Sequence, residues 1–332
     1  MKIGDTKTFV PSAFSELSRD GLKRDTAIRH TSRVKSSPST GDTDTLPWRA
    51  RSMDTPSGKP TNSDRKGDIA MRTMRTIAVL NMKGGVGKTT TVINLAHILS
   101  NDYRRRVLVV DCDPQCNLTS FYGAAGVDGP TVADVLGGTH EPYWYDNVIE
   151  VTPWISILPA STQLWQLDLA AIQEGRSNIN ALRNFVQAVQ EDQQIDVVLF
   201  DCPPGFTAAS TAALMAAQEV IIPVLMDGFS LEGMAEMLAQ VSSIRSSNPS
   251  LKVGGVLINQ WHRSVPVVQA EQVLRAMPVP VYKQTIRRSD KVLESTMVKE
   301  AVADYSVTSA AARDYRLLAQ EIFGEVRVYG QV

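Results

Sequence analysis

The 332-residue sequence has no hydrophobic run long enough to cross a lipid bilayer, although 43% of its residues are hydrophobic. Its longest apolar segments, such as Val220 to Met226, have the length of a strand and fall far short of the ~20 residues of a spanning helix. The first residues, Met1 to Ala13, contain no apolar core of the kind found in a secretory signal. The composition therefore predicts a soluble globular chain with room for one large α/β domain.

Cysteine is also scarce, because the chain contains three, at Cys112, Cys116 and Cys202. Three cysteines cannot pair completely, and all lie beside the sequence motifs described below, where a disulfide would oppose loop movement. A redox or metal pair at Cys112 and Cys116 is the alternative, but no histidine lies near them in the sequence. We expect free thiols in a reducing, cytoplasmic compartment.

The chain lacks a strong charge of either sign, with a formal net charge of −1, but the charge is unevenly distributed. Residues 1–74 carry 14 Lys and Arg against 9 Asp and Glu, which gives this segment +5 and leaves −6 for the rest. This segment is polar and has few apolar residues, so we expect a disordered basic arm that can contact nucleic acid or a partner. A solvated tail and a start codon placed too early are the alternatives, because Met71 and Met74 immediately precede the first predicted strand.

The most informative feature is a glycine-rich turn between a predicted strand, Thr76 to Leu80, and a predicted helix that begins near Thr89. Such a turn lets backbone N–H groups and the positive end of the helix converge on phosphate oxygens. Lys88 would neutralise the β- and γ-phosphates, and Thr89 would reach Mg²⁺. The predicted phosphate-binding residues are Gly84, Gly85, Val86, Gly87, Lys88, Thr89 and Thr90. Lys83 adds a second lysine at the mouth of this loop.

Beyond residue 75 the sequence alternates between predicted strands and helices, which favours a doubly wound, mainly parallel sheet with helices on both faces. The predicted strands are 76–81, 107–111, 155–158, 197–201, 220–224 and 253–259. The predicted helices are 88–100, 161–174, 179–192, 210–217, 231–246, 267–276 and 309–323. Residues 117–153 form a less regular stretch. In this architecture the functional site lies at the carboxyl ends of the strands.

Three aspartates follow or end predicted strands, where carboxylates can serve phosphoryl transfer. Asp201 ends an apolar strand and is placed to hold Mg²⁺ through water. Asp113 lies just past a strand end, where it can orient or deprotonate the attacking water, and Asp111 would assist at the metal. An aspartate at a strand end is often only a turn or cap residue, so these roles depend on the neighbouring glycine-rich loop.

These segments resemble the ParA/MinD superfamily of P-loop ATPases. Residues 83–89 match its deviant Walker A motif KGGxGK[ST], residues 111–117 its D-x-D-P-Q-x-N segment, and residues 201–204 its Walker B strand with D-x-P-P. The resemblance extends from about Arg75 to Glu325 and implies a P-loop ATPase domain over residues 75–326, followed by a short tail at 327–332. It also implies ATP and Mg²⁺ as cofactors.

The same resemblance implies roles for two further residues. Lys83 corresponds to the signature lysine that crosses a dimer interface to the partner's nucleotide, so that ATP holds a sandwich homodimer together. Asn259 ends a predicted strand and corresponds to an asparagine that reads the adenine ring, although asparagine after a strand is commonly a turn former.

Within the superfamily the motifs are most like those of plasmid and chromosome partition ATPases. That reading implies a nucleoid-associated dimer that binds DNA without sequence preference and hydrolyses ATP slowly until a ParB-like centromere-binding protein stimulates it. Arg287, Arg288 and Lys291 lie in the region where these ATPases place DNA-contacting arginines, and each neutralised phosphate adds salt-sensitive affinity. Arg313 and Arg316 are weaker candidates. The sequence does not decide whether the cargo is a plasmid, a chromosome, a mobile element or a protein cluster.

Four alternative functions require other sequence features. A membrane-cycling ATPase like MinD would end in an amphipathic lysine-bearing helix, which residues 323–332 do not resemble. An iron–sulfur electron donor would need cysteines between Asn117 and Asp201, where there are none. A tyrosine autokinase would show a dense C-terminal tyrosine cluster. A nucleotide-dependent DNA-binding adaptor with vestigial hydrolysis stays open, although Lys88, Asp113 and Asp201 favour catalysis.

Overall fold

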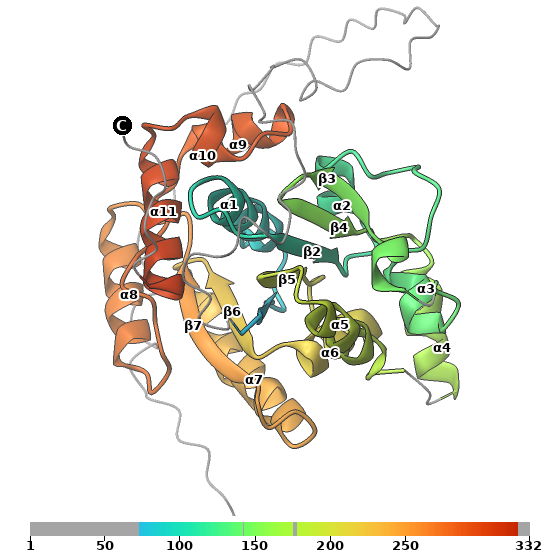
Figure 1. Ribbon diagram of the computed structural model, residues 1–332. Coiled ribbons are helices and arrows are strands. Elements are labelled where there is room, and N and C mark those ends of the chain that lie inside the picture. Colours follow the sequence, from blue (N-terminus) through green and yellow to red (C-terminus); the bar gives the residue numbers. More distant parts are fainter. Residues whose placement is uncertain (1–72, 142, 175–177, 325–332) are drawn as a thin grey trace, which may run out of the picture. The chain divides into compact units, whose positions relative to one another are not determined.

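A computed structural model describes residues 73–141, 143–174 and 178–324 (Figure 1). The predicted arm as far as residue 72 and the predicted tail 327–332 lie outside these residues. Among the helices of the described residues, none is both long and apolar enough to span a membrane.

The described chain is organised around a seven-stranded sheet in the order β3-β4-β2-β5-β1-β6-β7. Only β3 is antiparallel to its neighbour, and the other paired strands run parallel. The strands are β1 Arg75–Val79, β2 Val107–Asp111, β3 Ile149–Thr152, β4 Ile155–Leu158, β5 Val197–Asp201, β6 Glu219–Val224 and β7 Lys252–Ile258. The predicted doubly wound, mainly parallel sheet is therefore confirmed.

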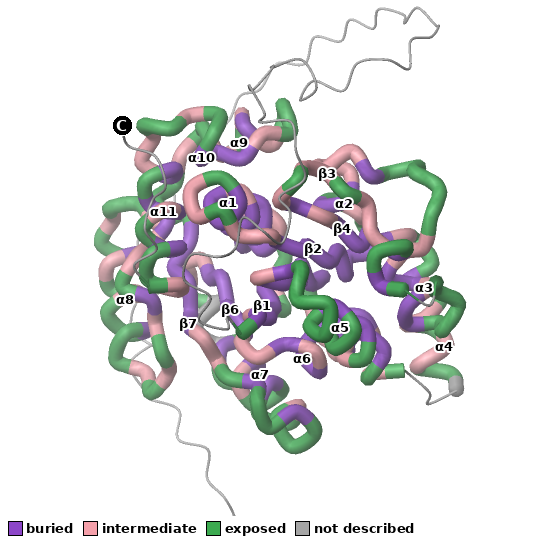
Figure 2. The backbone as a smooth tube through the Cα atoms, in the orientation of Figure 1, coloured by how far each residue is buried: buried purple, intermediate pink, exposed green. Residues whose placement is uncertain are grey.

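Helices cover both faces of this sheet, and the central strands are buried between them (Figures 1 and 2). One buried cluster joins the sheet to α1, α10 and α11, and the other joins it to α3, α5, α6 and α7. Because both faces are covered, β2 and β5 consist of buried residues throughout. The helices are α1 Lys88–Asn101, α2 Asn117–Phe121, α3 Val132–Gly137, α4 Leu164–Glu174, α5 Ala181–Asp192, α6 Ala208–Ala216, α7 Gly228–Arg245, α8 Val265–Ala276, α9 Asp290–Met297, α10 Val302–Tyr305 and α11 Ala310–Phe323, with the 3₁₀ turn η4 Trp144–Asn147.

The expected elements agree with the observed ones to within a few residues, but the stretch from 117 to 153 proves more regular than the sequence indicates. It contains α2, α3, η4 and the edge strand β3. These elements span four to six residues each, too few to establish a hydrophobic period. Pairing with β4 determines β3, and that contact is not visible in the local sequence.

One ion pair fastens the amino edge of the sheet. Arg75 opens β1, and its guanidinium donates to both carboxylate oxygens of Glu219, the first residue of β6, at 2.8 and 2.9 Å. The same group donates to the carbonyl of Ile322 at 2.7 Å and lies 4.6 Å from the centroid of the Phe323 ring. Arg75 therefore ties two neighbouring strands to the end of α11.

The strand register brings the predicted site residues to one edge. Asp201 at the end of β5 is the register partner of Val79 in β1 and of Asp111 in β2. The loop from β1 to α1 and both aspartates thus meet at the carboxyl edge of the sheet, where parallel α/β sheets place their ligands.

Candidate active site

The loop between β1 and α1 has the backbone conformation of a phosphate cradle. Gly85 and Gly87 have φ values of 73° and 90°, in the left-handed region that residues with a side chain rarely adopt. Gly87 is the N-cap of α1, so the free N–H groups of the first helical turn begin directly at the loop. The amide of Asn81 braces the loop by donating to the Pro223 carbonyl and accepting from the Lys83 N–H.

Lys88 is buried at this loop, and its ammonium donates to the carbonyl of Lys83 at 2.9 Å. Burial lowers the pKa of Lys88, and the nearby Asp201 carboxylate opposes this shift. The ammonium therefore lies inside the curve of the loop, where an anion would restore the solvation that burial removes.

Asp201 is the most unusual group in this part of the structure. It is fully buried, and neither carboxylate oxygen has a hydrogen-bond partner among the described residues. Burial and then repulsion from Asp111 raise its pKa well above the ordinary value, while the nearby Thr89 hydroxyl and Lys88 ammonium oppose that rise. A buried carboxylate without hydrogen bonds is unfavourable unless a cation compensates it.

Asp111 is buried as well, but its oxygens are satisfied. One accepts from the Asp113 N–H at 3.1 Å, and the other from the N–H and hydroxyl of Thr119 in α2, at 2.8 and 2.6 Å. Burial raises the pKa of Asp111 to about 6, and the bonds from Thr119 limit that rise. Asp111 therefore anchors the segment between β2 and α2, and its predicted assistance at a metal stays a prediction.

Asp113 lies within this anchored segment. It is almost fully buried, and one of its oxygens accepts from the Gln115 N–H at 2.9 Å. This carboxylate also acts on the charge of Lys88, where it is one of the groups that raise the lysine's pKa. The structure thus brings Asp113 to the nucleotide loop, and its predicted action on water is untested.

The donor set suits Mg²⁺ bound together with a phosphate better than a metal held by protein alone. Among the described residues, no group of three or more His, Cys, Asp or Glu side chains is arranged to hold a metal ion. Mg²⁺ keeps several waters and needs only one or two protein oxygens besides those of a nucleotide. Asp201 and Thr89 could supply those two groups, and the unsatisfied Asp201 carboxylate is the observation that makes the ion fit.

Asn259 follows β7 and lies beneath the loop. Its amide donates to the Val86 carbonyl at 2.7 Å and accepts from the Gln260 N–H at 2.8 Å. A side chain on Gly87 would collide with it, because the added carbon would lie 2.1 Å from the Asn259 amide nitrogen. In this structure Asn259 supports the loop backbone, and the predicted contact with adenine is untested.

A cavity of about 320 Å³ opens beside Gly87 and Thr90, next to Asn259. Arg287 and Arg288 also line it, so two of the three predicted DNA-binding residues lie beside the nucleotide loop. A larger hollow of about 570 Å³ lies at the amino edge of the sheet, lined by residues such as Thr76 and Gln218. That hollow is remote from the loop, and the smaller cavity is the one that extends the phosphate cradle.

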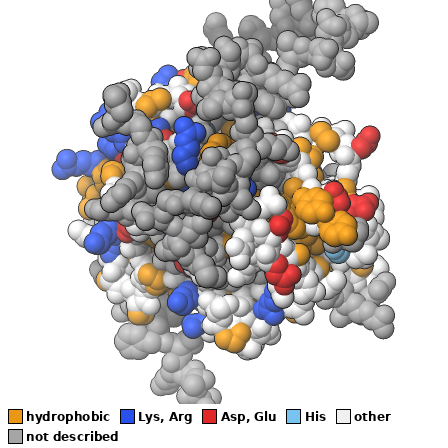
Figure 3. All heavy atoms as spheres, viewed as in Figure 1, with side chains coloured by type: hydrophobic (Ala, Val, Ile, Leu, Met, Phe, Trp, Pro, Cys, Tyr) orange, Lys and Arg blue, Asp and Glu red, His pale blue; other side chains and the backbone are white. Residues whose placement is uncertain are grey.

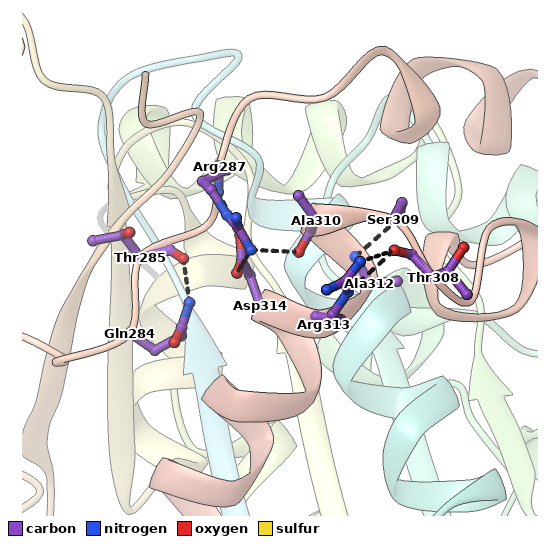
Figure 4. A network of polar contacts seen from close by, with 9 residues as sticks. All are labelled: Gln284, Thr285, Arg287, Thr308, Ser309, Ala310, Ala312, Arg313 and Asp314. Carbon is purple, nitrogen blue, oxygen red and sulfur yellow. Dashed lines mark hydrogen bonds and ion pairs between the residues drawn. The ribbon is translucent and has the colours of Figure 1, made fainter. Parts of the chain in front are cut away.

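Arg287 is held by a buried partner (Figure 4). Its guanidinium donates to both oxygens of Asp314 in α11, at 2.7 and 2.8 Å, and its N–H donates to the same carboxylate at 3.0 Å. Asp314 is 2% exposed, so the arginine compensates a buried charge.

Arg288 is exposed, and Lys291 pairs with Glu294 at the surface. Arg287 therefore has a structural role, whereas Arg288 and Lys291 lie at the surface. Arg316 and Arg313 of α11 also bond within the chain.

The predicted interface lysine, Lys83, forms an ion pair with Asp227 at 2.5 Å. Both side chains are more than one-third exposed, so the pair itself contributes little to stability. Asp227 immediately precedes α7, and the pair connects the mouth of the loop to the β6–α7 connection. Lys83 is thus positioned at the surface of the loop, whereas Lys88 is inside it.

Sequence reasoning missed Thr119, Gln260, Asp227 and Asp314. Gln260 donates its amide to the Gly85 carbonyl at 3.3 Å, and the other three support site residues as described above. Asp227 had a local signal, since a carboxylate before a helix start is a familiar capping residue. The partners of Thr119 and Asp314 lie 8 and 27 residues away, and no local pattern relates them.

Comparison with known proteins agrees with this geometry. Residues 74–253 match a family model described as an AAA domain. The chromosome-partitioning ATPase Soj of Thermus thermophilus is 35% identical over 257 residues, which cover 76% of this chain and 97% of that protein. The chromosome partitioning protein ParA of Caulobacter vibrioides is 31% identical, with 76% and 96% covered.

The chain belongs to the Soj/ParA family of partition ATPases. A solved structure of the septum site-determining protein MinD of Pyrococcus horikoshii, complexed with Mg-ADP, superposes with a TM-score of 0.60. It is 25% identical and covers 76% of this chain and 96% of that chain. The predicted superfamily and the P-loop fold are thus confirmed.

The buried carboxylate of Asp201 yields a prediction about stability. We expect Asp201→Asn to stabilise the chain by about 1–3 kcal/mol in the absence of Mg²⁺ and nucleotide, because a buried neutral amide costs less than a buried charge. Urea unfolding measures this, and the exposed Asp128→Asn serves as the control, with a change below ~0.5 kcal/mol. The same variant should lose stabilisation by Mg-ATP. A less stable Asp201→Asn protein would show that the carboxylate has a partner.

Proposed function

We propose that this chain is an ATP-dependent, dimerising DNA-partition ATPase that acts with ATP and Mg²⁺. The observation that carries the proposal is the buried, unpartnered carboxylate of Asp201 beside Lys88 and Thr89. A metal-bound triphosphate would satisfy the carboxylate and the ammonium together. Membership of the Soj/ParA family supports the partition role.

The residues would share the work of phosphoryl transfer, which depends on positioning and on charge neutralisation. Lys88 and the N–H groups at the start of α1 would bind phosphate oxygens, and Thr89 and Asp201 would hold Mg²⁺, which neutralises charge on the phosphates. Asp113 would orient the attacking water. Basal turnover would be slow because water positioning is completed only when a ParB-like partner docks.

The ATP state would bind DNA without sequence preference and place the protein on the nucleoid in the cytoplasm. Arg288 and Lys291 are exposed, and they support this part of the proposal better than Arg287 does. Figure 3 shows Lys and Arg side chains gathered on the side of the molecule where α8 and α11 lie in Figure 1.

Nucleotide binding is tested first. Lys88→Ala removes the buried ammonium from the loop, so we expect ATP affinity to fall at least ~100-fold, as loss of a charge-assisted contact of about 3 kcal/mol requires. Isothermal titration calorimetry with Mg-ATP measures it. Lys252→Ala, an exposed lysine at the opposite edge of the sheet, should bind as the wild type does. Unchanged binding by Lys88→Ala would reject the site.

Dimerisation is tested in a background that cannot hydrolyse ATP. Asp113→Ala should retain ATP and accumulate as a dimer, because the attacking water is no longer oriented. Adding Lys83→Ala should leave ATP bound to a monomer, since the lysine no longer reaches across the interface. Light scattering after size-exclusion chromatography distinguishes the two states, with Asp227→Ala as the control that removes the ion pair of Lys83 and keeps the lysine. A dimeric double variant would contradict the sandwich arrangement.

DNA binding is tested by charge reversal at Arg288 and Lys291. Each substitution to Glu should weaken binding to random-sequence duplex DNA and reduce the slope of log affinity against log salt by about 1. Fluorescence anisotropy with a non-hydrolysable ATP analogue measures both quantities, and Lys252→Glu is the matched control. ATP affinity is checked in parallel because Arg288 lines the cavity beside the loop. Unchanged DNA affinity would move the DNA surface elsewhere.

A further inference from the structure

Helix α4 presents an apolar face that nothing in the described part of the chain covers. Trp165, Leu169 and Ile172 are 56%, 54% and 81% exposed. Their spacing of four and then three residues places them on one side of the helix. We call these three residues the α4 stripe. The core side of the same helix is already occupied, because Leu164 is buried in the cluster that includes α3, α5 and α6.

The α4 stripe is uncharged, and the whole of α4 contains no lysine or arginine. The single aspartate, Asp168, is used internally, since its carboxylate accepts from the Ala208 N–H at 2.8 Å. Exposed aromatic and aliphatic residues grouped on one helix face are typical of surfaces that bind another protein. The absence of cations in α4 makes this face unsuitable for DNA.

A continuous path connects α4 to the nucleotide loop. Ala208 is the first residue of α6, directly after the segment 202–207 that follows Asp201. Pro204 in that segment is exposed, and its Cγ lies 4.0 Å from the position that a side chain on Gly84 would take. Met82, also partly exposed at 39%, stands at the loop mouth. Met82 and Pro204 are thus exposed apolar residues beside the loop, and Pro204 lies in the segment that leads to the contact between α6 and α4.

We propose that the α4 stripe packs against a second copy of this chain in the ATP-bound dimer. This inference rests on the proposed function, because it assigns the apolar part of the dimer interface. A stable interface buries about 800 Å² on each partner around an apolar core. The loop mouth cannot provide that core alone, since Lys83 and glycines form most of it, and the Asp168–Ala208 hydrogen bond places α4 beside the segment that follows Asp201.

Self-association also suits the chemistry of the stripe. A two-fold dimer brings the same patch of both copies into one interface, so the patch must be complementary to itself. An uncharged apolar face meets that condition, whereas a face with charges of one sign would repel its copy. The Asp168–Ala208 hydrogen bond would further couple α4 to the segment after Asp201, so that nucleotide binding and the position of the stripe change together.

The experiment uses Leu169→Glu and Ile172→Glu in the full chain with the Asp113→Ala substitution, which prevents hydrolysis. We expect both to bind Mg-ATP within about twofold of their parent and to raise the dimer dissociation constant at least ~10-fold, since each buries a charge at the interface. Analytical ultracentrifugation measures the dimer, and calorimetry measures nucleotide binding. Circular dichroism confirms folding, and Ile172→Glu stays informative if Leu169→Glu does not fold.

The matched control is Val273→Glu, at a residue of α8 that is 47% exposed and far along that helix from the carboxyl edge of the sheet. It should dimerise like its parent. If the two α4 variants also dimerise normally, the stripe faces a different protein and the assignment is overturned, while the proposed ATP dimer stands. An Asp113→Ala protein that binds ATP and remains a monomer would overturn both.

Discussion

The arrangement of the site depends on one electrostatic constraint, the burial of Asp201 without a hydrogen-bond partner at the end of a central strand. Protein folding normally avoids this, because an isolated buried charge is expensive. Here the cost is reduced by Lys88 and Thr89, which the first turn of α1 brings to the same edge. The part of this burial cost that remains favours the binding of a cation together with an anion. A cation bound beside Asp201 would remove this local instability.

The neighbouring carboxylate shows the opposite solution. Asp111 is the register partner of Asp201, yet it accepts three hydrogen bonds and fixes the segment that carries Asp113. Two aspartates at equivalent strand ends thus differ, because Asp111 is fully hydrogen-bonded and Asp201 is buried without a hydrogen-bond partner. Asp314 gives a third case, in which a buried carboxylate is compensated by Arg287. The hydrogen-bond or ion-pair partner of a buried carboxylate therefore indicates whether it has a structural role, and its position on a strand does not.

The ion pair of Lys83 with Asp227 lies at the mouth of the loop, and α4 contacts the segment that follows Asp201. The site in one chain is open on this side, where the exposed groups include a lysine at the loop mouth and apolar residues. A second copy would place like surfaces against each other around the nucleotide. Figure 3 shows a further hydrophobic patch near α3, mixed with acidic side chains, which differs in character from the uncharged stripe.

The fold and the nucleotide loop could be predicted from the sequence because their signals are local. Strands β2, β4 and β5 match their predicted bounds, since each is a short and mostly apolar run, and every residue of β2 and β5 is buried. The left-handed glycines and the two lysines of the loop lie within six consecutive residues, so their spacing in the sequence predicts the loop. The short elements between 117 and 153 could not be predicted, because contacts with distant strands determine them.

The sequence by itself determined which residues enter the site, since strand ends and a glycine-rich turn must meet at one edge of a parallel sheet. Only the tertiary structure decided what each residue does there. It left Asp201 without a partner, satisfied Asp111 through Thr119, and paired Arg287 with Asp314 across 27 residues. The physical reason is that burial and hydrogen bonding depend on neighbours in space, and residue spacing along the chain does not encode them.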